Sequence, residues 1–375
     1  MIYLDYNATA PMKPAVRAAV AEAMERYGNA SSVHRFGRIV RRHIEDARAN
    51  VAALVGVKSA QVIFTSGGTE SNNLAVRNVQ QGARIATSSI EHESILSNAA
   101  GAPRIPANEQ GIIDLEQAKA IMRGLPSRSL VSVMLVNNET GIIQPVARIA
   151  EIARAQGHYT HTDAVQAAGR LPVDFDSLGA DYLSLSAHKI GGPQGVGALI
   201  VSERVLASFT PLLRGGGQEM NRRPGTENVP GIAGFGAAAQ LAADDLRDMP
   251  RLAQLRDRFE KRLQEIGGED VEIIGKSAPR VANTACLVTE GMVGETQVMA
   301  MDLEGVAVSA GAACSSGKVK PSHVLLAMGL PEARAKSGLR VSLGWKTEAS
   351  DIERCVAAWQ KIYVRAGGRN KSKAA

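Results

Sequence analysis

The chain has 375 residues, which is more than one simple core holds and enough for two domains. Its content of 45% hydrophobic and 21% charged residues is ordinary for a soluble globular protein, and no apolar run is long enough to cross a bilayer. The net charge is +6, but aromatic residues make up only 4% and no basic stripe with interleaved aromatics occurs, so nucleic-acid binding is not expected.

The cysteines and the N-terminal sequence indicate a reducing compartment. Three cysteines, far apart and odd in number, do not form a disulfide framework. Residues 1–5 lack the basic stretch followed by an apolar stretch that begins a secretory signal. We therefore expect a cytoplasmic protein.

The first part of the chain predicts alternating helices and strands. Apolar residues within 40–54 share one helical face, and the apolar run 61–64 leads through a glycine turn into a second helix. The same pattern predicts strands at 83–87, 130–136, 158–162, 182–185 and 197–201, and a helix at 145–155. Strands that alternate with helices indicate an α/β fold with a mostly parallel sheet.

From Asp244 onward the composition changes, and a second, smaller domain is predicted. Residues 244–266 read as one long charged helix with an apolar face, and Gly267 and Gly268 end it. Strands and helices then alternate at shorter spacing. The predicted division is a large domain of residues 15–245, a small domain of residues 1–14 and 246–365, and a basic tail of residues 366–375 that we expect to be disordered.

The three cysteines differ in their surroundings. Cys355 falls on the apolar stripe of a predicted helix and Cys286 in a strand-like segment, so we expect both to be packed and unreactive. Cys314 lies in a run of very small residues, 308–317, whose glycines leave the backbone loose. This run is compatible with a presented thiol and equally with an inert residue in a turn.

Polar residues gather where the predicted strands end, which is where open α/β sheets bind ligands. The first group, Ser66–Thr69, opens a helix, and free N–H groups and glycines there favour an anion such as a phosphate. The same residues are also compatible with an ordinary N-cap turn. The group lacks the lysine of the P-loop, so ATP is not favoured.

Two further strand ends offer a lysine and an acid. Lys189 follows a strand and precedes two glycines, and a desolvated lysine there can form a Schiff base with an aldehyde, although an isolated lysine is more often exposed. Asp163 can pair with a protonated pyridine nitrogen or cap a turn, and His92 reads as an ordinary loop histidine. A phosphate site, a Schiff-base lysine and an acid are the three groups that a pyridoxal phosphate enzyme supplies.

With these residues in place, the chain resembles the cysteine desulfurases of the bacterial NifS/IscS type, within the class V aminotransferase-like pyridoxal phosphate enzymes. The resemblance runs nearly end to end. Its motifs, in chain order, are Tyr3–Thr9, Ser32–Gly37, Thr65–Ser71, Val136–Gly141, His161–Gln166, Ser186–Lys189, Arg223–Thr226, the Cys314 run and Gly338–Gly344.

The resemblance implies a fold and a cofactor. The fold is the pyridoxal phosphate-dependent transferase fold of type I, similar to aspartate aminotransferase. It has a mostly parallel central sheet with helices on both faces and a smaller α/β C-terminal domain. The large domain would bind pyridoxal 5'-phosphate, the small domain would carry the Cys314 run, and the protein would be a homodimer.

The resemblance also implies a role for each matching residue. Lys189 would hold the cofactor as an internal aldimine, and His92 would stack on its ring. The remaining binding roles would fall to Gly68, Thr69, Ser186 and His188 for the phosphate, Thr226 for the phosphate of the neighbouring subunit, Asp163 for the pyridine nitrogen, Gln166 for the ring hydroxyl, and Asn138 and Arg340 for the substrate carboxylate.

The implied reaction converts L-cysteine to L-alanine through the cofactor aldimine. Lys189 would remove the α-proton, and the thiolate of Cys314 would attack the substrate sulfur and carry it as a persulfide to an acceptor protein. The acceptor is left open among iron–sulfur cluster assembly, nitrogenase assembly, tRNA thiolation and molybdenum cofactor routes. No metal is required, and whether Cys314 ligates an iron–sulfur cluster in transit is also left open.

Three alternatives stand beside this interpretation. A selenocysteine lyase can share every cofactor residue, and the relative turnover of cysteine and selenocysteine separates the two. A small-substrate aminotransferase needs no thiol, so Cys314 argues against it. A degenerate, inactive scaffold for iron–sulfur assembly is the non-enzyme alternative, and the joint presence of Lys189, Asp163, His92 and Cys314 argues against it.

Overall fold

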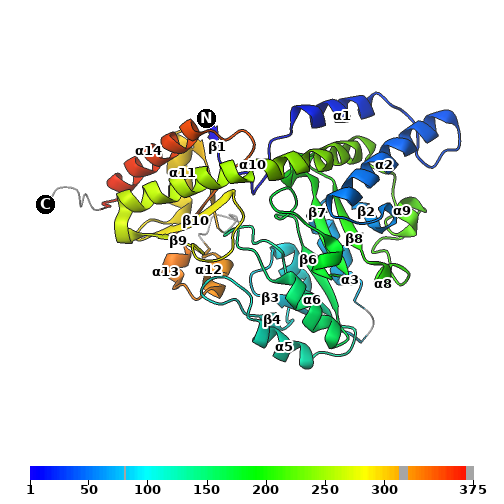
Figure 1. The fold of residues 1–375 in the computed structure, drawn as a ribbon, viewed down its shortest axis with the longest axis horizontal. Helices are drawn as coiled ribbons and strands as arrows, with labels where there is room; N and C mark the ends of the chain where they lie inside the picture. The colour runs from blue at the N-terminus through cyan, green and yellow to red at the C-terminus, as the bar shows by residue number, and fades with distance from the viewer. Residues whose placement is uncertain (80–81, 312–319, 369–375) are drawn as a thin grey trace.

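The computed structural model describes residues 1–79, 82–311 and 320–368. Cys314 and most of the predicted basic tail therefore lie outside the described residues. The described residues form two packed parts, each around its own sheet (Figure 1). None of the helices in these residues is long and apolar enough to span a bilayer.

The larger part is built on a seven-stranded sheet. Its strands, in sheet order, are β2 (Val62–Thr65), β8 (Gly197–Val201), β7 (Tyr182–Ser186), β6 (Tyr159–Asp163), β5 (Leu130–Ser132), β3 (Ile85–Ser88) and β4 (Arg104–Ile105). Strand β8 is antiparallel to β2 and β7, and the other four pairings are parallel. The predicted mostly parallel sheet is confirmed.

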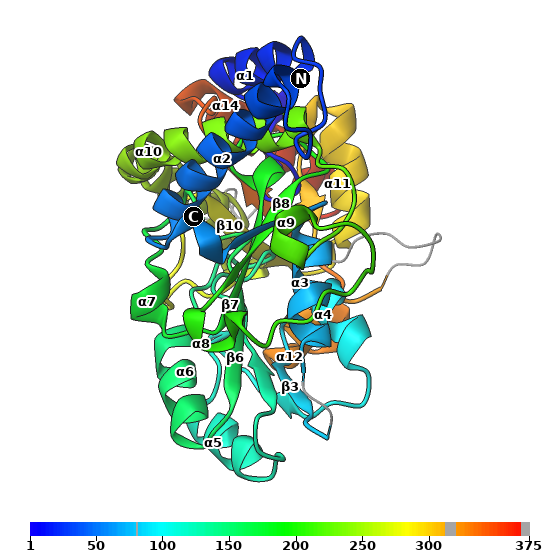
Figure 2. The same ribbon diagram turned by 90° about the vertical axis from the view of Figure 1, so that its right-hand side faces the viewer.

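Helices cover both faces of this sheet, which is why β7 and β8 are buried along their whole length. Figure 2 shows α6 and α7 on one side of the strands and α3 and α4 on the other. The helices of this part are α1 (Pro14–Met24), α2 (Arg35–Leu54), α3 (Gly68–Arg77), α4 (Glu93–Leu96), α5 (Leu115–Arg123), α6 (Val146–Ala155), α7 (Phe175–Leu178), α8 (Glu203–Leu206) and α9 (Gln218–Asn221), with 3-10 turns at Ser59–Gln61, Ser97–Ala99 and Ala187–Lys189.

The long helix α10 (Val229–Gly267) joins the two parts and begins 15 residues before its predicted start at residue 244. The predicted start was late because it rested on the change to charged residues at 244, whereas the stretch 229–243, with six alanines and three glycines, is also helical. Here the glycines are needed for close packing, since a Cβ on Gly236 would lie 2.5 Å from Cα of Ala47 in α2. Helix α10 crosses the predicted domain boundary at residues 245/246, and that division stays a prediction.

The smaller part holds a four-stranded antiparallel sheet in the order β12-β13-β10-β9. The N-terminus joins it through β1, which pairs with β11. Its elements are β1 (Ile2–Tyr3), β9 (Val271–Ile273), β10 (Thr284–Thr289), α11 (Gly294–Leu303), β11 (Val306–Ala307), β12 (Ser309–Ala310), α12 (His323–Ala327), α13 (Glu332–Ala335), β13 (Gly338–Ser342) and α14 (Ala349–Arg365), with a 3-10 turn at Gly268–Asp270.

Two of the three cysteines belong to elements of the smaller part, and both are buried: Cys355 in the core of that part, and Cys286 in the apolar cluster shared with the larger part. Cys286 and Cys355 are 1% and 0% exposed, and the prediction that both are packed is confirmed. Burial raises the pKa of each thiol to about 12. Neither thiol forms a thiolate at neutral pH, so neither is suited to nucleophilic attack.

Strand β5 ends at Ser132, four residues before its predicted end at residue 136. The backbone continues beside β6, because Val133 and Leu135 donate to the carbonyls of His161 and Asp163. The N–H of Met134 instead donates to the buried carboxyl of Glu91 at 2.7 Å. A side chain therefore replaces a strand as the partner on that side, and the regular ladder stops.

Candidate active site

A cavity of about 840 Å³ lies between the two parts, at the carboxyl ends of β2, β6 and β7. This volume suits a small cofactor together with its substrate. The predicted site residues that line it are Gly68, Thr69, His92, Asn138, Asp163, Gln166, Ser186, His188, Lys189 and Arg340. Thr226 does not line it and is exposed on another loop, and Cys314 lies outside the described residues.

Lys189 ends the short turn after β7 and reaches across to the N-terminal segment. Its Nζ donates to the carbonyls of Asn7 at 2.6 Å and Ala8 at 2.8 Å. Burial, assisted by the cations of Arg170 and Arg340, lowers the pKa of this lysine to about 7. At neutral pH a large share of Lys189 is therefore a free amine, which is the form that attacks an aldehyde.

The start of α3 forms an anion site beside Lys189. Its N-cap is Gly67, which has φ 151° and no side chain to cap the helix. The first N–H groups of the helix, including those of Gly68 and Thr69, have no acceptor within it. A Cβ on Gly68 would lie 2.9 Å from a methyl group of Val165, so the glycine allows close packing at this position. An uncapped helix N-terminus facing a cavity favours a phosphate.

A chain of hydrogen bonds joins Asp163 to His92. Asn72 donates through Nδ2 to Asp163 at 2.7 Å and to the hydroxyl of Ser94 at 2.8 Å. The Ser94 hydroxyl lies 2.8 Å from Nδ1 of His92, and the Ser94 N–H donates to the same nitrogen. Nδ1 is therefore an acceptor, and a neutral His92 carries its proton on Nε2.

The sequence analysis missed Asn72 and Ser94. A signal for Asn72 was available, because it follows Thr69 by three residues and so shares a helix face with the anion site. Ser94 lies two residues after His92, but nothing in the sequence distinguishes it from a helix cap.

Arg340 enters the cavity from β13 of the smaller part. One terminal nitrogen donates to the carbonyl of Asn138 at 3.0 Å and the other to the carboxylate of Asp5 at 2.7 Å. Its Nε has no partner among the described residues, and the residue is only 6% exposed. A buried guanidinium with an unused donor suits a carboxylate ligand. The sequence analysis assigned no role to Asp5.

His188 and Gln166 line the cavity, and both form hydrogen bonds with the N-terminal segment. Nδ1 of His188 lies 3.1 Å from the hydroxyl of Thr9, and burial lowers the pKa of this histidine to about 4. The ring is therefore neutral at physiological pH. Gln166 donates through Nε2 to the carbonyl of Asn7 at 2.9 Å, the same carbonyl that accepts from Lys189.

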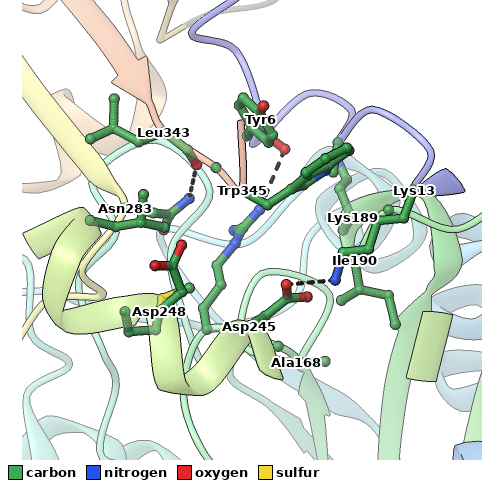
Figure 3. Close-up of a pocket in the computed structure, with 17 residues that line it drawn as sticks. Tyr6, Lys13, Ala168, Lys189, Ile190, Asp245, Asp248, Asn283, Leu343 and Trp345 are labelled. Atoms are coloured by element: carbon green, nitrogen blue, oxygen red, sulfur yellow. Dashed lines mark hydrogen bonds and ion pairs between the residues drawn. The ribbon is translucent and has the colours of Figure 1, made fainter. Parts of the chain in front are cut away.

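A second, much smaller cavity of about 40 Å³ lies behind Lys189. Figure 3 shows it between Tyr6, Trp345 and Asp245, with Lys13 paired to Asp245. That ion pair joins Nζ and Oδ1 at 2.5 Å. The space suffices for water but not for an organic ligand. Lys189 lines both cavities, and an organic ligand that reacts with it fits only in the larger one.

Residues 2–355 match the family model of aminotransferase class-V. The chain belongs to this family. The family prediction and the predicted α/β fold class are thereby confirmed. Within the class-V family, the chain is 40% identical to the cysteine desulfurase IscS of Dictyoglomus turgidum, over 97% of this chain and 95% of that protein.

Two solved structures are similar to this chain over most of their length. A NifS-like protein from Rickettsia africae superimposes with a TM-score of 0.90 at 36% identity, covering 97% of this chain and 99% of that one. A structure of SspA in complex with cysteine superimposes with a TM-score of 0.79 at 29% identity, covering 92% and 99% of the two chains.

Proposed function

We propose that this protein is a pyridoxal phosphate-dependent cysteine desulfurase that converts L-cysteine to L-alanine and transfers the sulfur to Cys314 as a persulfide. The observation that carries the proposal is the meeting of three groups on one cavity: the amine of Lys189, the carboxylate of Asp163 and the uncapped start of α3. The names of similar proteins, including a cysteine desulfurase and a structure with cysteine bound, support the same substrate.

The described residues fit pyridoxal 5'-phosphate. Its aldehyde matches Lys189, its pyridine nitrogen matches Asp163, and its phosphate matches the N–H groups of Gly68 and Thr69 with Ser186 and His188 beside them. When bound, the cofactor supplies an electron sink for carbanion chemistry at the substrate α-carbon. Gln166 would contact the ring hydroxyl, His92 the ring face, and Thr226 the phosphate bound by a neighbouring subunit.

The substrate carboxylate would bind Arg340. The free Nε of this arginine offers one hydrogen bond, and its Asp5-bound nitrogen offers a second if the carboxylate displaces Asp5. Asn138 lies against the same arginine. With the carboxylate held there, the amine of Lys189 would take the α-proton, a task for which a pKa of about 7 is well matched.

Cys314 would be the sulfur acceptor. The residues described on both sides of it in the sequence, Ser309–Gly311 and Lys320–Pro321, line the cavity. Its thiolate would form an S–S bond to the substrate sulfur as the C–S bond of the substrate breaks. Overall, L-cysteine and the Cys314 thiol become L-alanine and the Cys314 persulfide, with no other reactant needed.

The remaining parts of the proposal concern partners. The exposure of Thr226 supports a role across a homodimer interface, since it does not reach the cavity of its own chain. The persulfide would pass to a sulfur-acceptor protein, for iron–sulfur cluster assembly or another sulfur-containing product. We propose a cytoplasmic location, where thiols stay reduced.

The decisive experiment supplies L-cysteine and a reductant to the cofactor-loaded protein and measures alanine and sulfide. We expect Cys314→Ala to keep its bound cofactor, seen as a visible absorption band that borohydride removes, and to lose both products. Cys355→Ala is the matched control, because its thiol is buried and does not line the cavity, and we expect it to remain active. Undiminished sulfide release by Cys314→Ala would overturn the mechanism. Turnover of selenocysteine in the same assay tests the lyase alternative.

A further inference from the structure

Arg170 is a buried cation without an acidic partner. It is 8% exposed, and no ion pair in the described part of the chain includes it. Its donors contact only neutral acceptors: the side-chain oxygen and the carbonyl of Gln166, the latter at 3.1 Å, and the carbonyl of Tyr6 at 3.4 Å. Buried arginines normally have a carboxylate partner, so burying the unpaired guanidinium of Arg170 lowers the stability of the fold. This cost suggests that Arg170 has a functional role.

Arg170 and the carbonyl of Asn7 together fix the orientation of the Gln166 amide. An arginine has only donors, so the Gln166 atom that faces it must be Oε1. The amide nitrogen is then directed to the other side, where it donates to the carbonyl of Asn7. Gln166 therefore presents an N–H, and not an oxygen, toward the side where Lys189 lies.

Burial is the main cause of the low pKa of Lys189, and Arg170 adds to it through its charge. The groups that act on this lysine come from several elements: Arg170 after β6 and Arg340 on β13 oppose its protonation, and Asp163 on β6 and Asp5 in the N-terminal segment favour it. His188, next to it in the chain, is neutral at physiological pH. Of the two cations, Arg340 is ion-paired with Asp5 and Arg170 is not. The uncompensated charge belongs to Arg170.

We propose that Arg170 is a positioning residue of the active site, whose donors help fix the Gln166 amide with its N–H toward Lys189 and whose unpaired charge adds a positive potential at the lysine. This inference deepens the proposed function, because it matters for catalysis only if Lys189 binds the cofactor. Its charge effect is nevertheless a property of the cofactor-free protein. It can be measured without any catalytic assay.

The test measures the protonation of Lys189 in cofactor-free protein. A short pulse of acetic anhydride acetylates only neutral amines, and peptide mass spectrometry gives the labelled fraction of Lys189 at each pH, with exposed Lys58 as internal reference. We expect a midpoint near pH 7 in the wild type. In Arg170→Gln, which keeps a donor for Gln166 but no charge, we expect the midpoint to rise by about one pH unit. In Arg170→Lys, which keeps the charge, we expect it to move by less than half as much.

Each outcome decides part of the proposal. An unchanged midpoint in Arg170→Gln, in protein whose circular dichroism is that of the wild type, overturns the charge effect. Arg170→Met is the second neutral variant, for use if Arg170→Gln does not fold. A midpoint in Arg170→Lys displaced as far as in a neutral variant overturns it equally.

The second measurement tests whether Arg170 orients the side-chain amide of Gln166. Lysine cannot reproduce the planar fork of arginine. In cofactor-loaded Arg170→Lys, we therefore expect the pH at which the visible band changes to shift, although the midpoint of Lys189 in the cofactor-free protein moves by less than half as much as in Arg170→Gln. An unshifted band overturns the orienting role. Failure of the proposed function is seen separately, as wild-type protein that binds no cofactor.

Discussion

The two walls of the active-site cavity are held in different ways. The large-sheet wall, made by Gly68, Thr69, His92, Asp163 and Lys189, is fixed by hydrogen bonds to neutral partners such as Asn72 and the carbonyl of Asn7. The small-sheet wall is represented by Arg340, whose partner Asp5 is itself a carboxylate. A carboxylate partner can be exchanged for a substrate carboxylate. The difference fits the proposed function, in which the first wall would hold a resident cofactor and the second a substrate that comes and goes.

The largest expected effect is the loss of the amine from the large-sheet wall. In Lys189→Ala we expect cysteine turnover to fall by roughly 10⁴-fold or more, as when a covalent catalytic group is removed. The visible band that borohydride removes should also be absent. Absorption spectroscopy and alanine release measure both. Lys58→Ala, which removes an exposed lysine, is the control. Near-normal turnover in Lys189→Ala would show that this wall is not where the cofactor is held.

The next largest effect is expected on the small-sheet wall. Arg340→Ala removes the donors for the substrate carboxylate, and truncating a buried charged contact costs about 3 kcal/mol, or about 100-fold in kcat/KM. The loss should fall mainly on KM, with cofactor content unchanged. Steady-state kinetics on cofactor-loaded protein give the result, and Arg334→Ala, an exposed arginine paired with Glu272, is the control. Loss of the cofactor together with activity would contradict the division between the walls.

The charge state of Lys189 predicts a pH dependence of stability in the cofactor-free protein. The pKa of Lys189 is about 7 when folded and 10.5 in its ordinary state, so between these values the unfolded chain binds the extra proton. Stability conferred by this group therefore rises with pH from 7 to 10.5. Against Lys189→Met, we expect the melting temperature of the wild type to gain as pH rises through this window. A difference that is constant with pH would contradict a buried, proton-poor lysine.

The sequence predicted those features of the two walls that depend on local pattern. The alternation of strands and helices located the ends of β6 and β7 to within one residue, and with them Asp163 and Lys189, although β6 itself is mostly polar. The partners of these residues were not predicted, because the contacts join distant parts of the chain: Asn72 and Asp163 are 91 residues apart, and Asp5 and Arg340 are 335 apart. No local periodicity carries that information.

Helix α10 shows the opposite failure. Its start was placed at the local change to charged residues, whereas the helix extends further back, where Gly236 packs against Ala47 of α2. Arg170 could not be predicted from the sequence for a similar reason, since its proposed role depends on the absence of an acidic partner among the described residues around it. The sequence shows an arginine four residues after Gln166, but only the structure shows that no acid accompanies it.

The smallest effect is expected for Asp5→Asn, and it tests the exchangeable partner directly. The variant removes the carboxylate that pairs with Arg340 in the absence of substrate, and we expect it to be less stable by about 1 kcal/mol, near the upper end for a partly exposed ion pair. At a given concentration, a ligand stabilises the folded state more when it binds more tightly. The product L-alanine offers a replacement carboxylate, so it should raise the melting temperature of cofactor-loaded Asp5→Asn more than that of the wild type. Equal or smaller stabilisation of the variant would mean that Asp5 orients Arg340 for the ligand and does not compete with it.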